Sequence, residues 1–440
     1  MSDLRPRDKA GKLPVVARHG QQQKRGPVKT VLKIVGIVAA VALVATVSLA
    51  GITYWQLTNN LAQGGTEIDA DAEDIGDIAK IAGGFNILIV GSDECTENCE
   101  GYGVRGSKLN DVNILLHVSE DQTNAVAVSF PRDLIVPIPS CDKEDGSGTT
   151  SAMSAQAINV ALSTGGLNCV AKTVSAFTGL EIQFAGLITF PGVIAMSNAV
   201  GGVPVCVTNA VEDKRTGLKL DAGTTKLKGK KALAFLRSRH VVGDGSDLAR
   251  ISSQQVYMSS LVRTLQSADT LGDPRKLYAL ATAATENMSL SKNFQDVPTL
   301  ISIALALKDI PLKNILFVQY PSDTGMGGIY KGKVGPVEPD ATQMMEYIAN
   351  DEPFTTKNLG THGGATADPT EAPTEDPTKE PTKEPTKTPT KTPTKTPTNN
   401  PTTPATNEPT TPVTPTQTAT QAPAVGSGTN GETVTCSVTK

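Results

Sequence analysis

Residues 34–55 form a run without a charged side chain, and no other feature constrains the possible folds of this chain as strongly. A helix rises about 1.5 Å per residue, so a run of this length can cross the roughly 30 Å of hydrocarbon in a bilayer. Tyr54 and Trp55 end the run, where interfacial aromatic side chains are expected. The run therefore predicts a transmembrane signal-anchor helix. The alternative is a cleavable signal peptide ending near Ala50, but the apolar region of such peptides is usually shorter.

The segment before this run, 1–33, is a basic tail, although the whole chain has a formal net charge of -4. Its basic residues are Arg5, Arg7, Lys9, Lys12, Arg18, Lys24, Arg25, Lys29 and Lys33, against Asp3 and Asp8. Basic flanks of a transmembrane helix stay in the cytoplasm. We therefore expect a single-pass protein of the cell membrane with a cytoplasmic N-terminus. The linker 56–84 and everything after it should lie outside the cell.

Cysteine usage agrees with export. The six cysteines are Cys95, Cys99, Cys141, Cys169, Cys206 and Cys436. An even number in an oxidising compartment favours disulfides. No Cys-x-x-Cys pair is present and the four histidines are scattered, so zinc and other His-based metal centres are poorly supported. We expect Cys141 to bond to Cys169, consider Cys95 or Cys99 as the partner of Cys206, and leave Cys436 open.

The C-terminal part is a low-complexity segment. Residues 351–430 contain repeats such as EPTKEPTKTPTKTPTKTPT, which have too little apolar surface to offset the entropy of folding. We expect this segment to be a disordered or extended tail, either carrying sugars on its threonines or unmodified. A short cysteine-containing C-terminus, 431–440, follows it.

The region between anchor and tail, 85–350, has the pattern of one α/β domain. Short apolar runs rich in Val and Ile predict strands at 85–91, 111–119, 124–130 and 202–207. Apolar spacing of three and four predicts helices at 154–166, 168–180, 191–202 and 252–268. This alternation predicts a mixed central sheet with helices on both faces.

Polar residues follow several of the predicted strands. They are Asp93, Asp111, Arg132, Asp133 and the arginines of FLRSRH, which are Arg237 and Arg239. We expect all of them to meet at one edge of the sheet. If 236–240 is extended, Arg237 and Arg239 share a face and present two guanidinium forks to one ligand.

A helix starting near Asp247 would place Arg250 and Gln254 on one face, since they are four residues apart. Several arginines in one cleft suit phosphate, and a pyrophosphate could engage all of them. The neighbouring carboxylates then suit Mg²⁺, which takes one or two carboxylates beside substrate phosphates. For any single residue the alternative is a surface charge, or a loop cap in the case of Asp247.

The order of these motifs resembles the LytR-CpsA-Psr family of envelope glycopolymer transferases, in an actinobacterial-like form. The matching text is NILIVGSD, LNDV, SFPRD, AIN with STGG, FPGV with AVGGV, ALAFLRSR and DLARISSQQ. The resemblance is close over 85–265 and weaker onward to about residue 350. It implies an α-β-α fold and a Mg²⁺-dependent phosphotransferase.

The resemblance also implies roles for individual residues. Asp93 and Asp111 would hold Mg²⁺, with Asp111 also a candidate base, and the pyrophosphate of a polyprenyl-linked substrate would be bound by Arg132, Arg237, Arg239, Arg250 and Gln254. The segment 184–200 would wall a tunnel for the lipid tail, or else be ordinary core.

Three positions depart from the family pattern. Asn110 replaces a basic residue, for which Arg105 or Lys108 could substitute; Ala157 replaces a lysine; and Ser253 replaces a second arginine. These departures weaken the roles expected of individual residues, but the group of arginine and carboxylate residues named above remains.

The implied reaction moves a glycopolymer from polyprenyl pyrophosphate to peptidoglycan or a surface protein and releases polyprenyl phosphate. No nucleic-acid partner is expected. Two alternatives use the same residues: a polyprenyl-pyrophosphate hydrolase, and a non-catalytic envelope receptor or regulator that binds the lipid.

Overall fold

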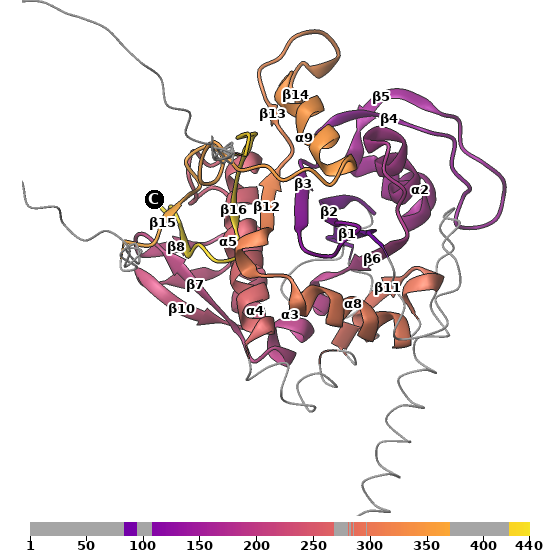
Figure 1. Ribbon diagram of the computed structural model, residues 1–440. Coiled ribbons are helices and arrows are strands. Elements are labelled where there is room, and N and C mark those ends of the chain that lie inside the picture. Colours follow the sequence, from indigo (N-terminus) through magenta and orange to yellow (C-terminus); the bar gives the residue numbers. More distant parts are fainter. Residues whose placement is uncertain are drawn as a thin grey trace, which may run out of the picture. The chain divides into compact units, whose positions relative to one another are not determined.

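The computed structural model describes residues 83–94, 108–267, 280, 283–284, 286–295, 297–369 and 422–440 (Figure 1). The expected anchor, the linker, Cys95, Cys99 and most of the Pro/Thr-rich segment lie outside these residues. Within the described part, no helix has both the length and the apolar character needed to cross a bilayer.

The central sheet has seven strands in the order β11-β6-β1-β2-β3-β12-β16. Their bounds are β11 (Met288–Leu290), β6 (Phe184–Ile188), β1 (Phe85–Ser92), β2 (Asn110–Val118), β3 (Ala125–Phe130), β12 (Ile315–Gln319) and β16 (Ser427–Asn430). β1 runs antiparallel to β2 and parallel to β6, and β3 runs parallel to β12. The sheet is therefore mixed, as predicted, and the first three predicted strands fall on β1, β2 and β3.

Helices cover both faces of this sheet. On one face, Leu88 and Leu115 pack against α2 (Ala161–Thr178) and α9 (Asp340–Ala349). On the other face, Ile87 and Ile114 pack in a cluster with residues of α5 (Asp247–Gln266) and α8 (Val297–Asp309). Alternate residues of each strand thus point to opposite cores, which confirms the predicted layered α/β architecture.

A second, four-stranded sheet corrects one strand prediction. Its order is β10 (Gly223–Leu227), β7 (Val203–Val207), β17 (Thr435–Ser437) and β15 (Ala365–Ala367). The run 202–207 was expected in the central sheet but forms β7 here. Val203, Val205 and Val207 face a core shared with Phe235. On the opposite side of the strand Pro204 is exposed, whereas Cys206 is buried and bonded to Cys436.

The remaining elements are short. They are β4 (Ile135–Ile138), β5 (Met153–Ala157), β8 (Val211–Asp213), β9 (Leu218–Leu220), β13 (Ser322–Asp323), β14 (Gly335–Pro336), α3 (Phe190–Ala199), α4 (Lys230–Arg237), η1 (Ile158–Val160), η2 (Lys292–Phe294), η3 (Leu312–Asn314) and η4 (Gly328–Tyr330). The helix predicted over 154–166 is wrong in its first half, because those residues pair with β4 as strand β5. The predicted break at Gly165 and Gly166 is a kink inside α2, where Gly166 has φ of 67°.

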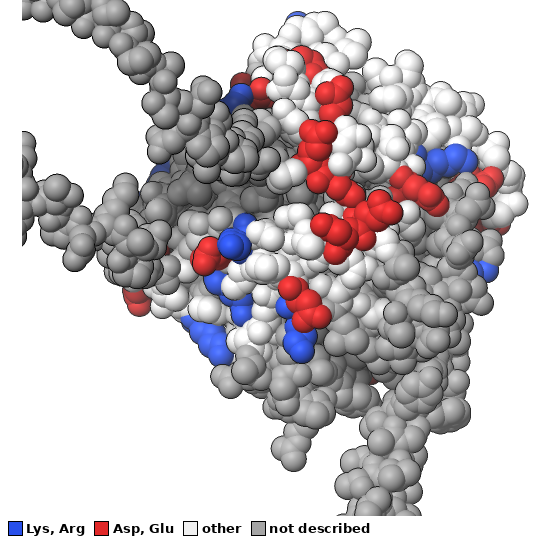
Figure 2. Space-filling model, in the orientation of Figure 1, with Lys and Arg blue, Asp and Glu red and all other residues white. Residues whose placement is uncertain are grey.

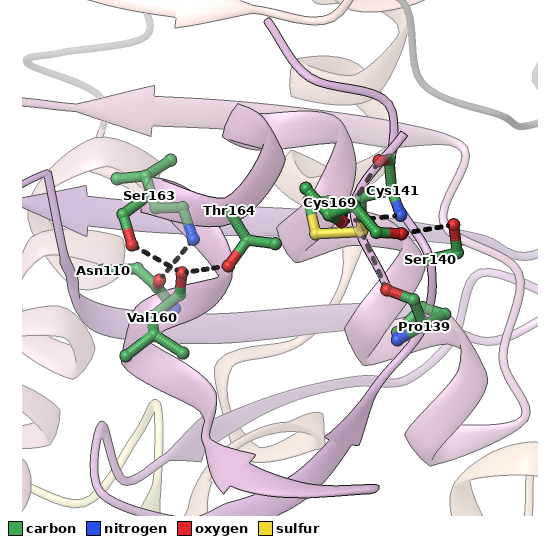
Figure 3. Close-up of a disulfide and its surroundings, with 10 residues drawn as sticks. Asn110, Pro139, Ser140, Cys141, Val160, Ser163, Thr164 and Cys169 are labelled. Carbon is green, nitrogen blue, oxygen red and sulfur yellow. Dashed lines mark hydrogen bonds between the residues drawn. A yellow bond between two sulfur atoms is a disulfide. The ribbon is translucent and has the colours of Figure 1, made fainter. Parts of the chain in front are cut away.

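The chain beyond residue 350 corrects the expected boundary of the domain. Residues 351–369 and 422–440 belong to the fold, because β15 and β17 build the second sheet and β16 forms an edge of the central sheet. A bond between Cys206 and Cys436 fastens the C-terminal segment, so the proposed pairing of Cys206 with Cys95 or Cys99 is wrong. The Cys141–Cys169 bond is confirmed and ties a loop to α2 (Figure 3).

Charges are segregated on the surface. Exposed basic side chains gather around β8, β9, β10 and the start of α4: Lys214, Arg215, Lys219, Lys226, Lys228, Lys230 and Lys231. On the face shown in Figure 2, Lys and Arg lie mostly at the lower left and Asp and Glu higher up. The small formal net charge of -4 therefore conceals local fields of both signs.

Candidate functional site

A β-bulge in β2 sets the direction of Asp111. Gly91 pairs with Val112, but Ser92 pairs with Asn110, so Asp111 is the extra residue of the bulge. A bulge reorients the side chains that follow it and is frequent beside active sites. Asp93 comes directly after β1 and is 6% exposed, so both predicted carboxylates lie at the same end of the β1–β2 pair.

The bulge also turns Asn110 toward α2. Asn110 Nδ2 donates to the carbonyl oxygen of Ile158 at 3.0 Å, and its Oδ1 accepts from the backbone N–H of Leu162 at 3.1 Å. Figure 3 shows Asn110 beside Val160, Ser163 and Thr164 at the start of α2. The next residue of η1, Asn159, donates its backbone N–H to the carbonyl of Arg132 at 3.1 Å. Asn110, one of the three departures from the family pattern, is thus a buried brace for the segment that holds Arg132.

Five charged side chains form what we call the arginine cluster: Asp111, Arg132, Asp133, Asp247 and Arg250. Arg132 Nη1 donates to Asp111 Oδ1 at 2.8 Å, and Arg132 Nε lies 3.6 Å from both Asp133 Oδ2 and Asp247 Oδ1. Arg250 Nη2 lies 2.9 Å from Asp247 Oδ1 and donates to the carbonyl of Asp111 at 3.3 Å. Residues from the ends of β2 and β3 and from the start of α5 therefore meet, as the sequence predicted for Asp111, Arg132 and Arg250.

The two guanidinium groups of the cluster differ in electrostatic environment. Burial lowers the pKa of Arg250, the charge of Asp247 opposes this, and the nearby charges of Arg132 and Arg239 lower it further. Burial also acts to lower the pKa of Arg132, but Asp247, Asp111 and Asp133 outweigh it and raise that pKa. Neither shift removes the charge near neutral pH, since an arginine is ordinarily protonated up to about pH 12.

Both guanidinium groups retain hydrogen-bonding capacity. Among the described residues, the buried Nε atoms of Arg132 and Arg250 have no hydrogen-bond partner. Buried donors are normally satisfied, and unsatisfied ones cost about 1–3 kcal/mol each. Two guanidinium groups that share Asp247 and keep such donors suit an anionic ligand with several oxygen atoms.

Arg237 and Arg239 are arranged differently from the prediction. The segment 236–240 is not extended throughout, because α4 continues to Arg237, and Ser238, which follows, has strand-like dihedral angles. The guanidinium carbon of Arg237 lies 4.5 Å from the ring centre of Phe190, the first residue of α3. Arg239 Nε donates to Nε2 of His240 at 3.2 Å. The two side chains thus contact different residues, and the extended segment on which their common face depended is not present, although Arg239 acts electrostatically on Arg250.

Gln254 holds two helices together. It shares α5 with Arg250, as predicted, and its Nε2 donates to the carbonyl of Leu236 at 3.2 Å. This bond fixes the last turn of α4, directly before Arg237.

The sequence did not predict two contacts within or beside the arginine cluster, those of Asp247 and Lys333. Asp247 was considered as a loop cap, but the cap of α5 is Ser246, whose Oγ accepts from the N–H of Ala249. Asp247 is thereby available to the two arginines. Lys333 Nζ lies 2.6 Å from Asp133 Oδ1, and no motif marks this lysine. The spacing of Asp247 and Arg250 at i and i+3 is the one signal that indicated a pair.

Carboxylates in this region fit Mg²⁺ by their chemistry. Asp93 and Asp111 offer two carboxylates, the number that Mg²⁺ takes beside substrate phosphates. Lys108, considered as a substitute for the missing basic residue, is paired with Glu144 at 2.6 Å. Among the described residues, one group of three possible ligands lies close together, Cys206, Asp368 and Cys436, but its two sulfur atoms belong to a disulfide.

The segment 184–200 is not helical throughout, because 184–188 is strand β6. Its second part, α3, is almost entirely apolar, yet Val193, Ile194 and Met196 are only half-buried. This helix packs on α4, close to Arg237.

The fold and the cluster define a class: an α/β protein with arginine and carboxylate side chains gathered at one end of a mixed sheet, where an anionic ligand could be bound. The sequence profile of the LytR_cpsA_psr family matches residues 52–348, and the chain belongs to this family.

Curated relatives agree with this assignment. The chain is 27% identical over 345 residues to the cell wall biosynthesis protein LcpA of Corynebacterium glutamicum, which covers 72% of this chain and 63% of LcpA. It is 23% identical over 305 residues to the polyisoprenyl-teichoic acid–peptidoglycan teichoic acid transferase TagT of Bacillus subtilis, covering 67% of this chain and 87% of TagT. A solved LytR-Csp2A-Psr enzyme from Actinomyces oris has a TM-score of 0.48 at 20% identity, over 65% of this chain and 95% of that one. The chain thus spans less than two thirds of the length of LcpA.

Proposed function

We propose that this protein is a phosphotransferase that moves a glycopolymer from a polyprenyl-pyrophosphate carrier to peptidoglycan. The observation that carries the proposal is the arginine cluster itself, in which the buried Nε donors of Arg132 and Arg250 make no hydrogen bond to the described residues. The relatives support the reaction class, because TagT is named as a transferase from polyisoprenyl-teichoic acid to peptidoglycan.

Phosphoryl transfer requires the protein mainly to position the reactants and to stabilise negative charge on the phosphate oxygens. A hydroxyl oxygen of the acceptor attacks the phosphorus on the glycopolymer side, the bond to the bridging oxygen breaks, and polyprenyl phosphate leaves. Arg132 and Arg250 would donate to phosphate oxygens on which negative charge is retained. Asp247, which pairs with both, holds the two guanidinium groups in place. Asp111 is the candidate to accept the proton of the hydroxyl.

A divalent cation is part of the proposal. Asp93 and Asp111 would hold Mg²⁺, which supplies positive charge to the phosphate oxygens when it is bound. Arg237, at the end of α4, would then contact the ligand from the side of α3.

The lipid and the membrane complete the proposal. The half-buried apolar side chains of α3 would line the path of the polyprenyl tail, close to Arg237. The basic tail 1–33 would stay in the cytoplasm and residues 34–55 would span the membrane, so that the catalytic domain meets peptidoglycan outside the cell. A surface protein is the alternative acceptor.

The test is acceptor dependence. The full chain in detergent micelles is incubated with labelled lipid-linked glycopolymer, with and without purified peptidoglycan. We expect polyprenyl phosphate and wall-bound label to appear together, and only when acceptor is present. Release of polyprenyl phosphate without acceptor would indicate a hydrolase. Binding without turnover would indicate a receptor.

A further inference from the structure

We propose that the C-terminal residues Thr435–Lys440 act as a positioning element for the loop that carries Arg239. The proposal rests on the function proposed above and extends it to a part of the chain outside the family match, which ends at residue 348. This C-terminal strand comes after the Pro/Thr-rich segment, yet β17 lies inside the second sheet, between β7 and β15.

One side of the C-terminal strand holds the loop directly. The backbone N–H of Gly243 donates to the carbonyl of Val438 at 3.0 Å, and the N–H of Lys440 donates to the carbonyl of Val241 at 3.0 Å. Val242 and Thr439 form a bridge of the antiparallel type between these bonds. Residues 241–243 of the loop therefore pair with the C-terminal strand in an antiparallel manner. This pairing begins two residues after Arg239.

Another contact of the strand reaches α5. Ser437 Oγ and Ser253 Oγ are 2.7 Å apart, and both residues are 0% exposed. Ser253 is the position at which the family pattern has a second arginine. A buried serine here leaves room for the strand, and a longer side chain would have to displace Ser437. In this chain, therefore, the serine at 253 and the packing of the C-terminal strand on α5 are compatible.

The strand itself is firmly attached. Cys436 is bonded to Cys206 of β7. Thr439, 3% exposed, exchanges hydrogen bonds with Thr208 and Asn209, among them Thr439 Oγ1 to the Asn209 carbonyl at 2.7 Å. A support fixed at these points can restrict the loop, whose own anchors are the buried Val242, the core contact of Val241 and the pair of Asp244 with His362 at 2.9 Å.

The consequence concerns Arg239, which the family resemblance places among the pyrophosphate-binding residues and which would lose its position if the loop detached. Arg132 and Arg250 are held by Asp111 and Asp247 and would stay in place. Loss of the support should therefore lower turnover through Arg239 while the cluster still binds substrate, so that kcat falls and KM changes little.

A matched pair of variants tests this. Lys440→Pro removes the N–H that donates to Val241, whereas Lys440→Ala keeps it, and the side chain of Lys440 is exposed. Deletion of Thr439 and Lys440 is the stronger variant. Thr435→Val serves as a control on the same strand, because the buried hydroxyl of Thr435 has no hydrogen-bond partner.

Two measurements are made on the full chain. The first is amide hydrogen exchange over 240–245, which does not depend on any assumed reaction. We expect faster exchange in Lys440→Pro and in the deletion, and wild-type exchange in Lys440→Ala and Thr435→Val. The second is transfer, for which the deletion should lower kcat by roughly tenfold to a hundredfold, the size of effect produced by small misplacements of catalytic groups.

The outcomes are separable. Unchanged exchange in Lys440→Pro and in the deletion would overturn the positioning role, whatever the wild-type protein catalyses. Faster exchange with wild-type kcat would also overturn it. Absence of transfer in the wild-type protein would instead contradict the proposed function, while exchange would still report on the loop.

Discussion

The hydrogen bond that Arg239 donates to His240 depends on the protonation state of the imidazole. Arg239 Nε donates to Nε2 of His240, which can accept only while the imidazole is neutral. Desolvation, followed by the charges of Arg215 and Arg239, lowers the pKa of His240 from its ordinary value of 6.5. His240 is therefore neutral at neutral pH, and protonation at lower pH would place two cations side by side.

This geometry predicts a pH dependence of transfer. As the pH falls below the ordinary histidine pKa and through the lowered pKa of His240, the imidazole becomes protonated and Arg239 loses its acceptor, so the rate should fall. The free energy of unfolding should also decrease as the pH falls. The pKa of His240 is lower in the folded than in the unfolded state, so the unfolded state binds the proton more readily below the unfolded-state pKa. His240→Gln keeps an acceptor that does not titrate. Its pH profile should be flatter than that of the wild type, and identical profiles would refute this role of His240.

At the scale of elements, the bulge in β2 and the start of α2 depend on Asn110. Replacing Asn110 with Ala leaves the buried N–H of Leu162 without its side-chain acceptor. We expect a loss of about 1–3 kcal/mol in the free energy of unfolding, measured by urea denaturation. Asn124→Ala, at the other end of the β2–β3 pair and bonded through its side chain to Thr123, is the control. Equal midpoints for the two variants would show that Asn110 is not a brace.

The Cys141–Cys169 bond closes a loop with a sequence separation of 28, which corresponds to about 3–4 kcal/mol of stabilisation by restricting the unfolded chain. The Cys141→Ala, Cys169→Ala double variant should melt several degrees lower and keep transfer activity at low temperature. Mass spectrometry of unreduced peptides from exported protein checks the bond itself. Free thiols at both positions would contradict it.

Some elements of the fold could be predicted from the sequence and others could not. The apolar runs of β1, β2 and β3 are buried on both faces, and this pattern is visible in the sequence alone. The extended conformation considered for 236–240 does not hold at Arg237, because ALAFL is compatible with a strand or a helix and packing against the core around Phe235 decides for α4. The pairing of Asp247 with two arginines was not predicted, because it requires that Ser246, rather than Asp247, caps the helix. β16 and β17 could not be predicted, because both are short and pair with strands far away in the sequence.

At the scale of the whole molecule, the C-terminal segment closes the domain that begins before residue 85. The sequence predicted a domain ending at 350, because the Pro/Thr-rich repeats separate the last strands from the rest. Short strands that complete distant sheets carry little pattern of their own, whereas the family motifs were readable because each lies at the end of a predicted element.

The topology is a prediction for the intact chain. If the basic tail 1–33 stays in the cytoplasm, protease added to wall-stripped cells should digest the domain that contains β1 and α5. Cells permeabilised with detergent provide the control for protease activity. Full protection of the domain in intact cells would contradict the predicted orientation.

The central claim is that the arginine cluster binds the pyrophosphate of a lipid-linked glycopolymer. The most direct measurement is acceptor-dependent transfer by Arg132→Lys and Arg250→Lys, beside their melting temperatures. Lysine keeps the charge but lacks the guanidinium Nε donor, so each variant should lose roughly tenfold or more in kcat/KM, the value of one charge-assisted hydrogen bond. Arg215→Lys, at an exposed arginine, should transfer at the wild-type rate. Wild-type kcat/KM in both cluster variants, with unchanged melting temperatures, would contradict the claim.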